Sequence, residues 1–149
     1  MTELHPEVDT ETLVVQYLAD TEFTDDDDPG VSGKLPPGWT PAQQWIRVTA
    51  FGSTDADRGV GHVVAQRVDV EAFGPDALPL HRIAARALRA LRLLPTSSST
   101  FPGAVVTDVA KGIGIENRHD EASDAARYRF HVVVTLHPVE APPRYLTRQ

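Results

Sequence analysis

One stretch of the sequence, residues 63–94, joins a strand pattern to a helix pattern and so limits what the chain can fold into. Its first part, VVAQRVDVEAF, alternates between two kinds of side chain. A period of two predicts a strand with one face buried against a core. The face expected to be buried carries Val64, Gln66, Val68, Val70 and Ala72. The opposite face carries Arg67, Asp69 and Glu71.

A helix is predicted after the break at Gly74-Pro75-Asp76. Proline has no N–H to give to a strand ladder, and Asp76 can cap the helix that follows. At about 100° per residue, the apolar side chains gather on one side of this helix. They are Leu80, Ile83, Ala84, Ala87, Leu88, Leu91 and Leu94. Roughly opposite lie Arg82, Arg86, Arg89 and Arg92. No enzyme motif falls on this unit, which therefore indicates assembly rather than catalysis.

Composition limits the class of protein further. The 149 residues correspond to about one domain that can bury a core. The chain has no cysteine, which excludes disulfides, thiolate metal sites and thiol nucleophiles. No apolar run approaches the ~20 residues that span a bilayer, and the acidic N-terminus MTELHPEVD lacks the apolar core of a secretory signal. We therefore expect a soluble protein made in the cytoplasm, with no membrane partner.

The formal net charge of -7 is distributed unevenly. Residues 1–28 contain ten acidic residues and no Lys or Arg, and the acids end in the run Asp25, Asp26, Asp27 and Asp28. Residues 29–149 contain fourteen basic and eleven acidic residues. This asymmetry suggests that the acidic end of one subunit meets the basic part of a neighbour. The alternative is an ordinary solvated surface.

The rest of the chain contains a second helix and more strands. A helix is predicted over Thr10–Ala19 with Asp9 or Thr10 as its cap, and Val31–Leu35 is a candidate edge strand. Further strands are predicted at Trp45–Phe51, Ala104–Val109 and Arg127–His137, the second continuing over Lys111–Glu116 after a bulge at Gly112 and Gly114. Together these elements predict one α+β domain over residues 1–138. Its antiparallel or mixed sheet would have four to five strands packed by two main helices, followed by an extended tail at residues 139–149.

Two polar connections are candidate contact loops, because exposed loops on a rigid sheet commonly carry binding residues. One is Gly52–His62, with Asp55, Asp57 and Arg58, and the other is Pro95–Phe101, with Ser98 and Phe101. Each could equally be a plain flexible loop.

The other motifs do not indicate a catalytic, cofactor or metal site. His131 and His137 share one side of a strand but stand about 20 Å apart, too far for a shared ion. His119-Asp120 has no nearby nucleophile, and serines 97–99 lack a nucleophile elbow. Gly112 and Gly114 lack the ending of a phosphate loop.

Charged residues on the two strongest strands offer a different possibility. If those strands pair, Arg67, Asp69 and Glu71 would oppose Arg127, Arg129 and His131. This polar sheet face could otherwise meet a neighbouring subunit or a lumen.

The arginine stripe at residues 82–92 admits three interpretations: a solvated face, a carboxylate-binding protein contact, or a phosphate contact. The phosphate contact, as with DNA, ranks last of the three.

The order and spacing of these segments resemble the tail terminator proteins of long-tailed, siphovirus-type bacteriophages. The matching pieces are the N-terminal helix, WIRVTAF, the loop GSTDADRG, RVDVEAFG with its Ala/Arg/Leu-rich helix, GAVVTDV, and RYRFHVVVTLHP. The resemblance covers roughly residues 7–138 and depends on pattern and order, with no invariant signature.

This resemblance implies a structural virion protein at the junction of tail and neck. Six subunits would form a ring on the finished tail tube, stop its polymerisation and present a docking face for the head connector. DNA would pass through the lumen without specific binding. The resemblance carries over no catalytic residues and gives no role to Asp25–Asp28. The open alternatives are another neck component (a head-closure or head-to-tail adaptor protein), a small ligand-binding or hydrolytic domain, and a nucleic-acid-binding module.

Overall fold

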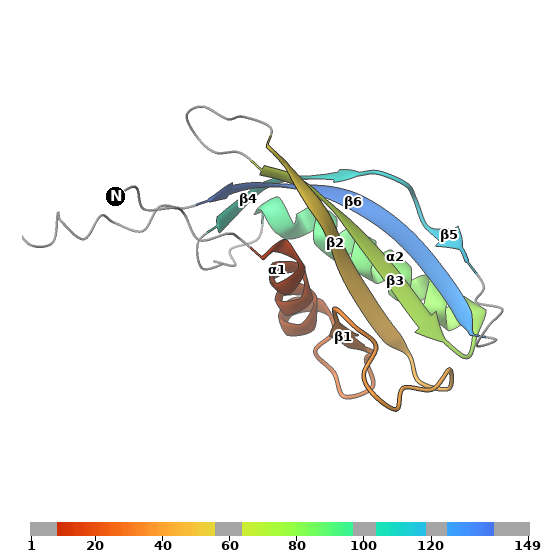
Figure 1. Cartoon of the computed structure of the whole chain (residues 1–149). Helices are drawn as coiled ribbons and strands as arrows, with labels where there is room; N and C mark the ends of the chain where they lie inside the picture. The colour runs from red at the N-terminus through yellow and green to blue at the C-terminus, as the bar shows by residue number, and fades with distance from the viewer. Residues whose placement is uncertain (1–8, 56–63, 97–103, 119–124, 139–149) are drawn as a thin grey trace, which may run out of the picture.

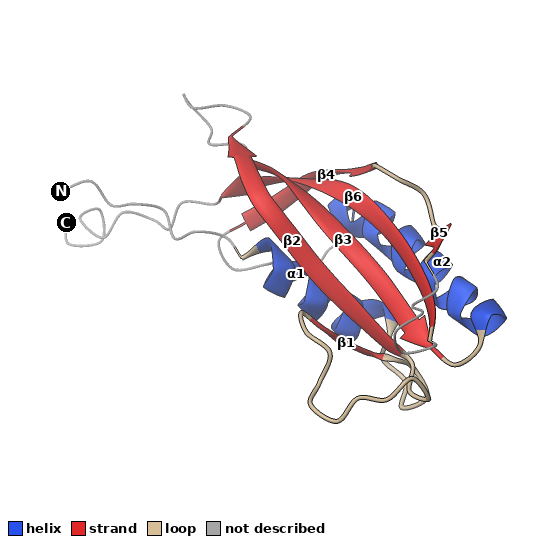
Figure 2. Cartoon of the chain, turned by 45° about the vertical axis from the view of Figure 1, so that its right-hand side comes forward, coloured by secondary structure: helices blue, strands red, loops and turns tan. Residues whose placement is uncertain are grey.

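The computed structural model describes residues 9–55, 64–96, 104–118 and 125–138. Its described residues form two α-helices and six strands in one mixed sheet, which confirms the predicted α+β class. The strands follow the order β1-β2-β3-β6-β4, and β5 also pairs with β6. β1 is parallel to β2, whereas all the other pairs are antiparallel. Both helices cover one face of the sheet (Figures 1 and 2). We call that face the inner face and the opposite one the outer face.

The three central strands are long and alternate between the two faces. They are β2 (Trp45–Asp55), β3 (Val64–Gly74) and β6 (Ala126–Pro138). As expected from the period of two, Val68 and Val70 of β3 are buried on the inner face beside Val132 of β6. β2 extends four residues past the predicted end at Phe51, after a register shift between Phe51 and Ser53. Pairing with β3 continues to Asp55, so part of the expected loop is strand.

The edges of the sheet are shorter. β1 (Gly30–Ser32) overlaps the expected edge strand Val31–Leu35 but ends at Ser32, and it pairs with the start of β2. On the other side lies β4 (Ala104–Lys111), whose register shifts between Val106 and Asp108. The sequence did not predict this shift. β4 ends at Lys111, and β5 (Glu116–Asn117) resumes the pairing with β6. At the glycines the pairing with β6 is irregular, as expected: the backbones of Gly112 and Ile113 both bond to the single residue His131, and Gly112 lies against the ring of that residue.

α2 (Ala77–Leu93) packs its apolar side on the inner face and continues as a short 3-10 turn, η2 (Leu94–Thr96). Leu80, Leu91 and Leu94 are buried as predicted. Leu88 is only half-buried, and Ala90 is buried instead. Asp76 takes the N-cap position, but its side chain makes no capping hydrogen bond. The backbone N–H of Leu80, which bonds to the carbonyl of Asp76, closes the first turn.

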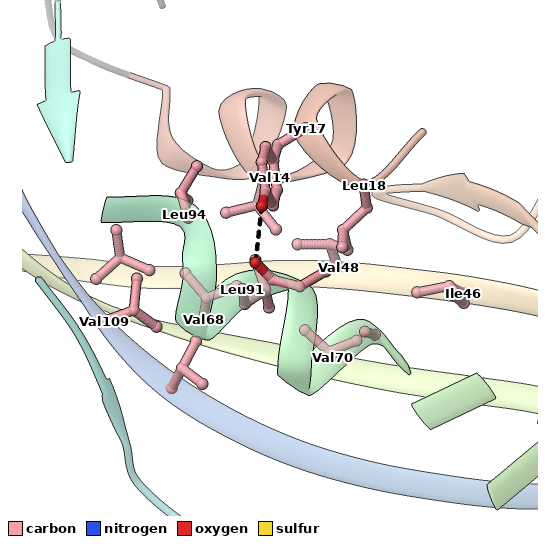
Figure 3. Packing of buried hydrophobic residues seen from close by; sticks show 14 of the residues in the cluster. Val14, Tyr17, Leu18, Ile46, Val48, Val68, Val70, Leu91, Leu94 and Val109 are labelled. Carbon is pink, nitrogen blue, oxygen red and sulfur yellow. Dashed lines mark hydrogen bonds between the residues drawn. The ribbon is translucent and has the colours of Figure 1, made fainter. Parts of the chain in front are cut away.

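α1 (Thr10–Tyr17) is joined to α2 through the core. Asp9 caps α1 as predicted, accepting from the backbone N–H of Thr12 at 3.1 Å. The helix continues beyond the expected end as a π-helical turn, η1 (Leu18–Glu22). Tyr17 reaches across and donates its buried hydroxyl to the carbonyl of Ala90 at 2.8 Å (Figure 3). This buried hydrogen bond joins α1 to α2 across the core.

α1 also protects the edge of β2 that extends past the short β1. The carboxylate of Glu11 accepts from the backbone N–H of Ala50 at 3.2 Å. An unpaired edge N–H is a template for strand addition, and a carboxylate that satisfies it removes that template. Gly33 makes this contact possible, because a Cβ there would stand 2.3 Å from the Glu11 carboxylate.

Candidate functional site

The four arginines of α2 divide into two groups. Arg82, Arg89 and Arg92 are exposed, as expected for the side of the helix away from the core. Arg89 is 74% exposed and lies 3.9 Å from a carboxylate oxygen of Glu22, a weak contact. In the part of the chain that the structure describes, Arg82 and Arg92 make no ion pair. These three residues form the exposed arginines of α2.

Arg86 is different, because it binds within its own chain. Its Nη1 donates to Asp28 at 3.0 Å, its Nε to the Glu22 carboxylate at 3.3 Å, and its Nη2 to the Glu22 carbonyl at 3.0 Å. The guanidinium also stacks on Phe23, 4.7 Å from the ring centroid. A planar group with fixed donors suits such multiple contacts. The residue therefore anchors the segment after η1 to α2.

Residues 25–28, which we call the acidic turn, form a closed β-turn. The backbone N–H of Asp28 donates to the carbonyl of Asp25 at 3.0 Å, and the N–H of Asp25 donates to the Asp28 carboxylate at 3.1 Å. Asp25, Asp26 and Asp27 are exposed, whereas the Asp28 side chain is 12% exposed. The hydrogen bond from Arg86 lowers the pKa of Asp28 below its ordinary value. The structure thus brings the acidic run into contact with the arginine stripe through the pair Asp28 and Arg86, and this contact lies within one subunit.

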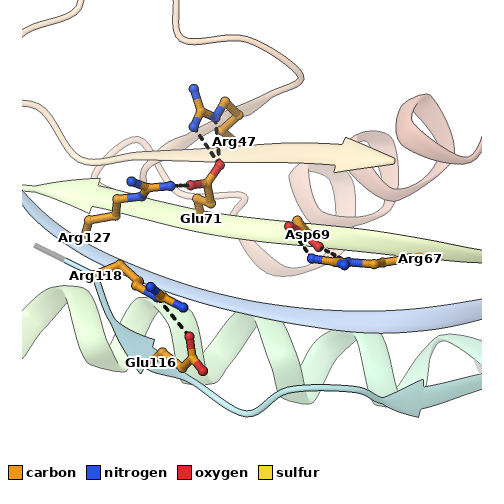
Figure 4. A network of polar contacts seen from close by, with 7 residues as sticks. All are labelled: Arg47, Arg67, Asp69, Glu71, Glu116, Arg118 and Arg127. Atoms are coloured by element: carbon orange, nitrogen blue, oxygen red, sulfur yellow. Dashed lines mark hydrogen bonds and ion pairs between the residues drawn. The ribbon is translucent and has the colours of Figure 1, made fainter. Parts of the chain in front are cut away.

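A second charged cluster lies on the outer face. Glu71 of β3 is buried and is held by two arginines from the flanking strands (Figure 4). Arg47 of β2 donates to one carboxylate oxygen from Nη2 at 2.7 Å and from Nε at 3.0 Å. Arg127 of β6 donates to the other oxygen. Both guanidiniums stack over the ring of Phe73, at 5.1 Å and 5.6 Å.

A second arginine–carboxylate pair, Arg67 with Asp69, lies on the same face. Arg67 donates to both carboxylate oxygens of buried Asp69, at 2.8 and 3.2 Å, in a bidentate pair along β3. Its guanidinium stacks on Phe51, which remains 47% exposed. Stacking and bidentate hydrogen bonds hold such guanidiniums in place. The outer face is therefore a layer of positioned arginines above two buried carboxylates.

The predicted strand pairing is confirmed, but the expected charge partners are only partly right. In the register of β3 with β6, Asp69 stands opposite His131 and Glu71 opposite Arg129. Glu71 nevertheless bonds to Arg127, and Asp69 to Arg67 of its own strand. Among the described residues, Arg129 makes no ion pair or side-chain hydrogen bond. It is half-buried and lies opposite Glu116 of β5, which pairs instead with Arg118.

Among the described residues, two polar atoms of this face are buried without a hydrogen-bond partner: Nε of Arg127 and Nδ1 of His131. Buried unsatisfied groups are uncommon and lower stability. Sequence reasoning missed the part played by Arg47, because the register of β2 with β3 was not predicted. The signal was present: Arg47 is the charged residue within the predicted strand WIRVTAF, on the side opposite Ile46 and Val48.

The candidate contact loops are largely outside the described residues. Asp55 belongs to β2, where it pairs with Val64 of β3. Asp57, Arg58, Ser98 and Phe101 lie outside the described residues. Within the described ranges, no three His, Cys, Asp or Glu residues are grouped to hold a metal ion. No helix there is long and apolar enough to cross a lipid bilayer.

Comparison with known proteins identifies a shared fold. No protein-family model matches the chain, and no curated protein matches it in sequence. The structure is similar to a chain of a solved assembly described as "Virion of native gene transfer agent (GTA) particle". The TM-score is 0.63 at 15% sequence identity, and the similarity covers 83% of this chain and 91% of that chain. At this identity, what the two chains demonstrably share is the fold.

Proposed function

We propose that this chain is a structural virion protein, a tail terminator that forms a closed ring on the finished tail tube. The observation that carries the proposal is the fold match to a virion chain, which extends over most of both chains. The order of sequence segments over residues 7–138 supports the finer assignment to a tail terminator. The ring, with six subunits, would occupy the growing end of the tube at the tail–neck junction and offer no surface for another tube subunit.

The charged surfaces fit a ring subunit. A closed ring built from head-to-tail contacts needs two different, complementary surfaces on each subunit. The described part of the chain has an acidic turn on the helix side of the sheet and a layer of arginines on the outer face. The exposed arginines of α2 are further candidates for a subunit contact. We assign no catalytic residue and no cofactor to the protein, and the DNA in the lumen would pass without specific binding.

The two candidate contact loops are anchored at one end of the sheet. β2 ends at Asp55, opposite the start of β3 at Val64. Val64 pairs with Leu136 of β6, and Leu136 pairs with Val106 near the start of β4. The connections at residues 56–63 and 97–103 therefore attach to the same end of the rigid sheet. That location supports a role for both loops in contacting one axial partner, either the tail tube or the head connector.

Electron microscopy of negatively stained protein, alone and mixed with tail tubes, tests this proposal. We expect rings in solution or at tube ends, and tubes of defined length when the protein is present during polymerisation. A matched mixture with head-connector protein forms the second arm. Binding to the connector with no effect on tube growth would contradict the terminator assignment and favour a head-closure or adaptor protein. Protein that remains monomeric in both mixtures would exclude a ring subunit.

A further inference from the structure

We propose that the outer face of the sheet is the docking surface for the acidic turn of a second copy of this chain. The inference rests on the proposed ring and names the two surfaces that would join its neighbouring subunits. The helix side of one subunit would then contact the strand side of the next.

The outer face is rich in positive charge that is already fixed in place. It carries Arg47, Arg67, Arg127 and Arg129 on three adjacent strands, with the carboxylates of Asp69 and Glu71 buried among them. Four guanidiniums and two carboxylates leave this part of the face positive. Three of the guanidiniums are held by carboxylates and stacked on phenylalanine rings. Binding to a positioned arginine loses less side-chain entropy, and arginine is common among the residues that dominate interfaces.

Arg129 gives this face an available donor. Its guanidinium makes no ion pair or hydrogen bond within the described residues, although it stands in register between Glu71 and Glu116. Both carboxylates bind other arginines. A half-buried cation whose neighbours are already paired favours an incoming carboxylate. We therefore place the centre of the docking surface at Arg129.

The acidic turn is the complementary group. Asp26 and Asp27 occupy the central positions of a β-turn closed by two hydrogen bonds. Both side chains are exposed and make no ion pair in the described part of the chain. Asp28 ties the base of the turn to Arg86. The turn is thus a compact projection of negative charge whose backbone is already ordered.

The two surfaces lie on opposite sides of the sheet. The acidic turn is bonded to α2, which packs on the inner face, whereas Arg129 belongs to the outer face. A turn therefore cannot reach the Arg129 surface of its own sheet. Contact between copies would be head-to-tail, the kind of interface that generates a closed ring when the rotation per subunit is right.

Two other pairings are less well supported. The exposed arginines of α2 could receive the turn, but their side chains are exposed whereas that of Arg129 is half-buried, so ordering them costs more entropy. Nucleic acid could bind the outer face through the same guanidiniums, but the formal net charge of -7 disfavours a phosphate polymer as the partner. Both pairings are outcomes of the following test.

Charge reversal in the full-length protein tests the contact. The variants are Arg129→Glu, Asp26→Arg and the double variant, with Arg82→Glu on α2 as the matched control. None of these residues makes an ion pair within the described chain, so circular dichroism and thermal melting are expected to report a folded protein in every case. Light scattering after size-exclusion chromatography measures the protein concentration at which half of the subunits are in rings.

We expect each single reversal of Arg129 or Asp26 to raise that concentration by about tenfold or more, because like charges then face each other. The double variant is expected to recover assembly to near the wild-type level, whereas Asp26→Arg with Arg82→Glu is not. Recovery by the Arg82→Glu combination would overturn the proposal in favour of α2. The proposal would also be overturned if Arg129→Glu formed rings at the same protein concentration as the wild type.

A DNA-binding arm uses fluorescence anisotropy with a short labelled duplex at low salt. If Arg129→Glu abolished duplex binding and left assembly intact, the outer face would bind nucleic acid and the proposal would be wrong. The two levels of inference fail differently. Wild-type protein that never forms rings, alone or on tubes, removes the proposed function and this contact with it. Rings that form normally despite Arg129→Glu remove the contact alone.

Discussion

The guanidinium of Arg86 donates a hydrogen bond to the carboxylate of Asp28 across 3.0 Å, and so joins α2 to the acidic turn within one chain. The two residues are 58 positions apart in sequence. The same guanidinium binds Glu22 and stacks on Phe23. One side chain thus holds a polar segment, residues 22–28, against a helix that belongs to the core.

Replacement of Arg86 by Gln is expected to lower the free energy of unfolding by about 1–3 kcal/mol, because it removes the hydrogen bonds and leaves two carboxylates poorly paired. Arg86 is 37% exposed, so solvent screening keeps the loss below that of a fully buried pair. Urea denaturation followed by circular dichroism measures the change. The control is Arg82→Gln, expected within about 0.5 kcal/mol of wild type. Equal stability of the two variants would contradict the anchoring role.

The contribution of Asp28 is expected to depend on pH. The hydrogen bond from Arg86 lowers the pKa of Asp28 in the folded state. A carboxyl with a lowered folded pKa stabilises above its ordinary value of 3.8 and loses that contribution as the pH falls through the folded pKa. The stability difference between wild type and Asp28→Asn should therefore be largest near neutral pH and shrink below the ordinary pKa. Asp9, whose pKa is also lowered, is present in both proteins and cancels in this difference. A pH-independent difference would refute the linkage.

Replacement of Tyr17 by Phe tests the polar contact between α1 and α2. The hydroxyl of Tyr17 donates to the carbonyl of Ala90 in a buried site. Its loss leaves that carbonyl without this donor, and we expect a cost of about 1–2 kcal/mol in thermal or urea unfolding. Tyr128→Phe is a suitable comparison, since the Tyr128 hydroxyl makes no hydrogen bond in the described part of the chain. A Tyr17→Phe protein as stable as the Tyr128→Phe protein would argue against the contact.

The outer-face cluster is expected to be most sensitive at Glu71. Glu71→Gln retains the shape of the side chain but leaves Arg47 and Arg127 without their counter-charge, for a loss of about 1–3 kcal/mol. The range lies below that for a fully buried pair because the arginines are 33% and 27% exposed. Glu116→Gln breaks a more exposed pair with Arg118 and should cost less than about 0.5 kcal/mol. Chemical denaturation that ranks the two in the reverse order would show that Glu71 does not organise the face.

The glycines after β4 are expected to differ although they are two residues apart. A Cβ on Gly112 would stand 2.1 Å from the ring of His131, whereas one on Gly114 meets nothing within 4 Å. We expect Gly112→Ala to cost about 1–3 kcal/mol, because the ring or the backbone must move. Gly114→Ala is expected to be nearly neutral. Thermal melting of both variants measures the two costs. If Gly112→Ala were as stable as the wild type, His131 would have room to turn away.

Sequence periodicity was sufficient for the elements and their faces. The period of two in residues 64–72 correctly placed Val68 and Val70 in the core and Asp69 and Glu71 on the other side. The helical period correctly placed Leu80 and Leu91 inside. Asp9 was correctly expected to cap α1. Each of these features depends on residues two to four positions apart, so local spacing contains the information.

The pairing of the charged side chains could not be predicted from local spacing. Whether Glu71 binds Arg127 or Arg129 depends on side-chain reach within a register that two distant strands set together. The joining of Asp28 to Arg86, and the capping of the Ala50 N–H by Glu11, likewise require helices and strands to be already packed. Local sequence thus determined which residues face the core and which are charged. Only the tertiary structure decided which charges meet and which, like Arg129, are left without a partner among the described residues, because those distances are set by long-range packing.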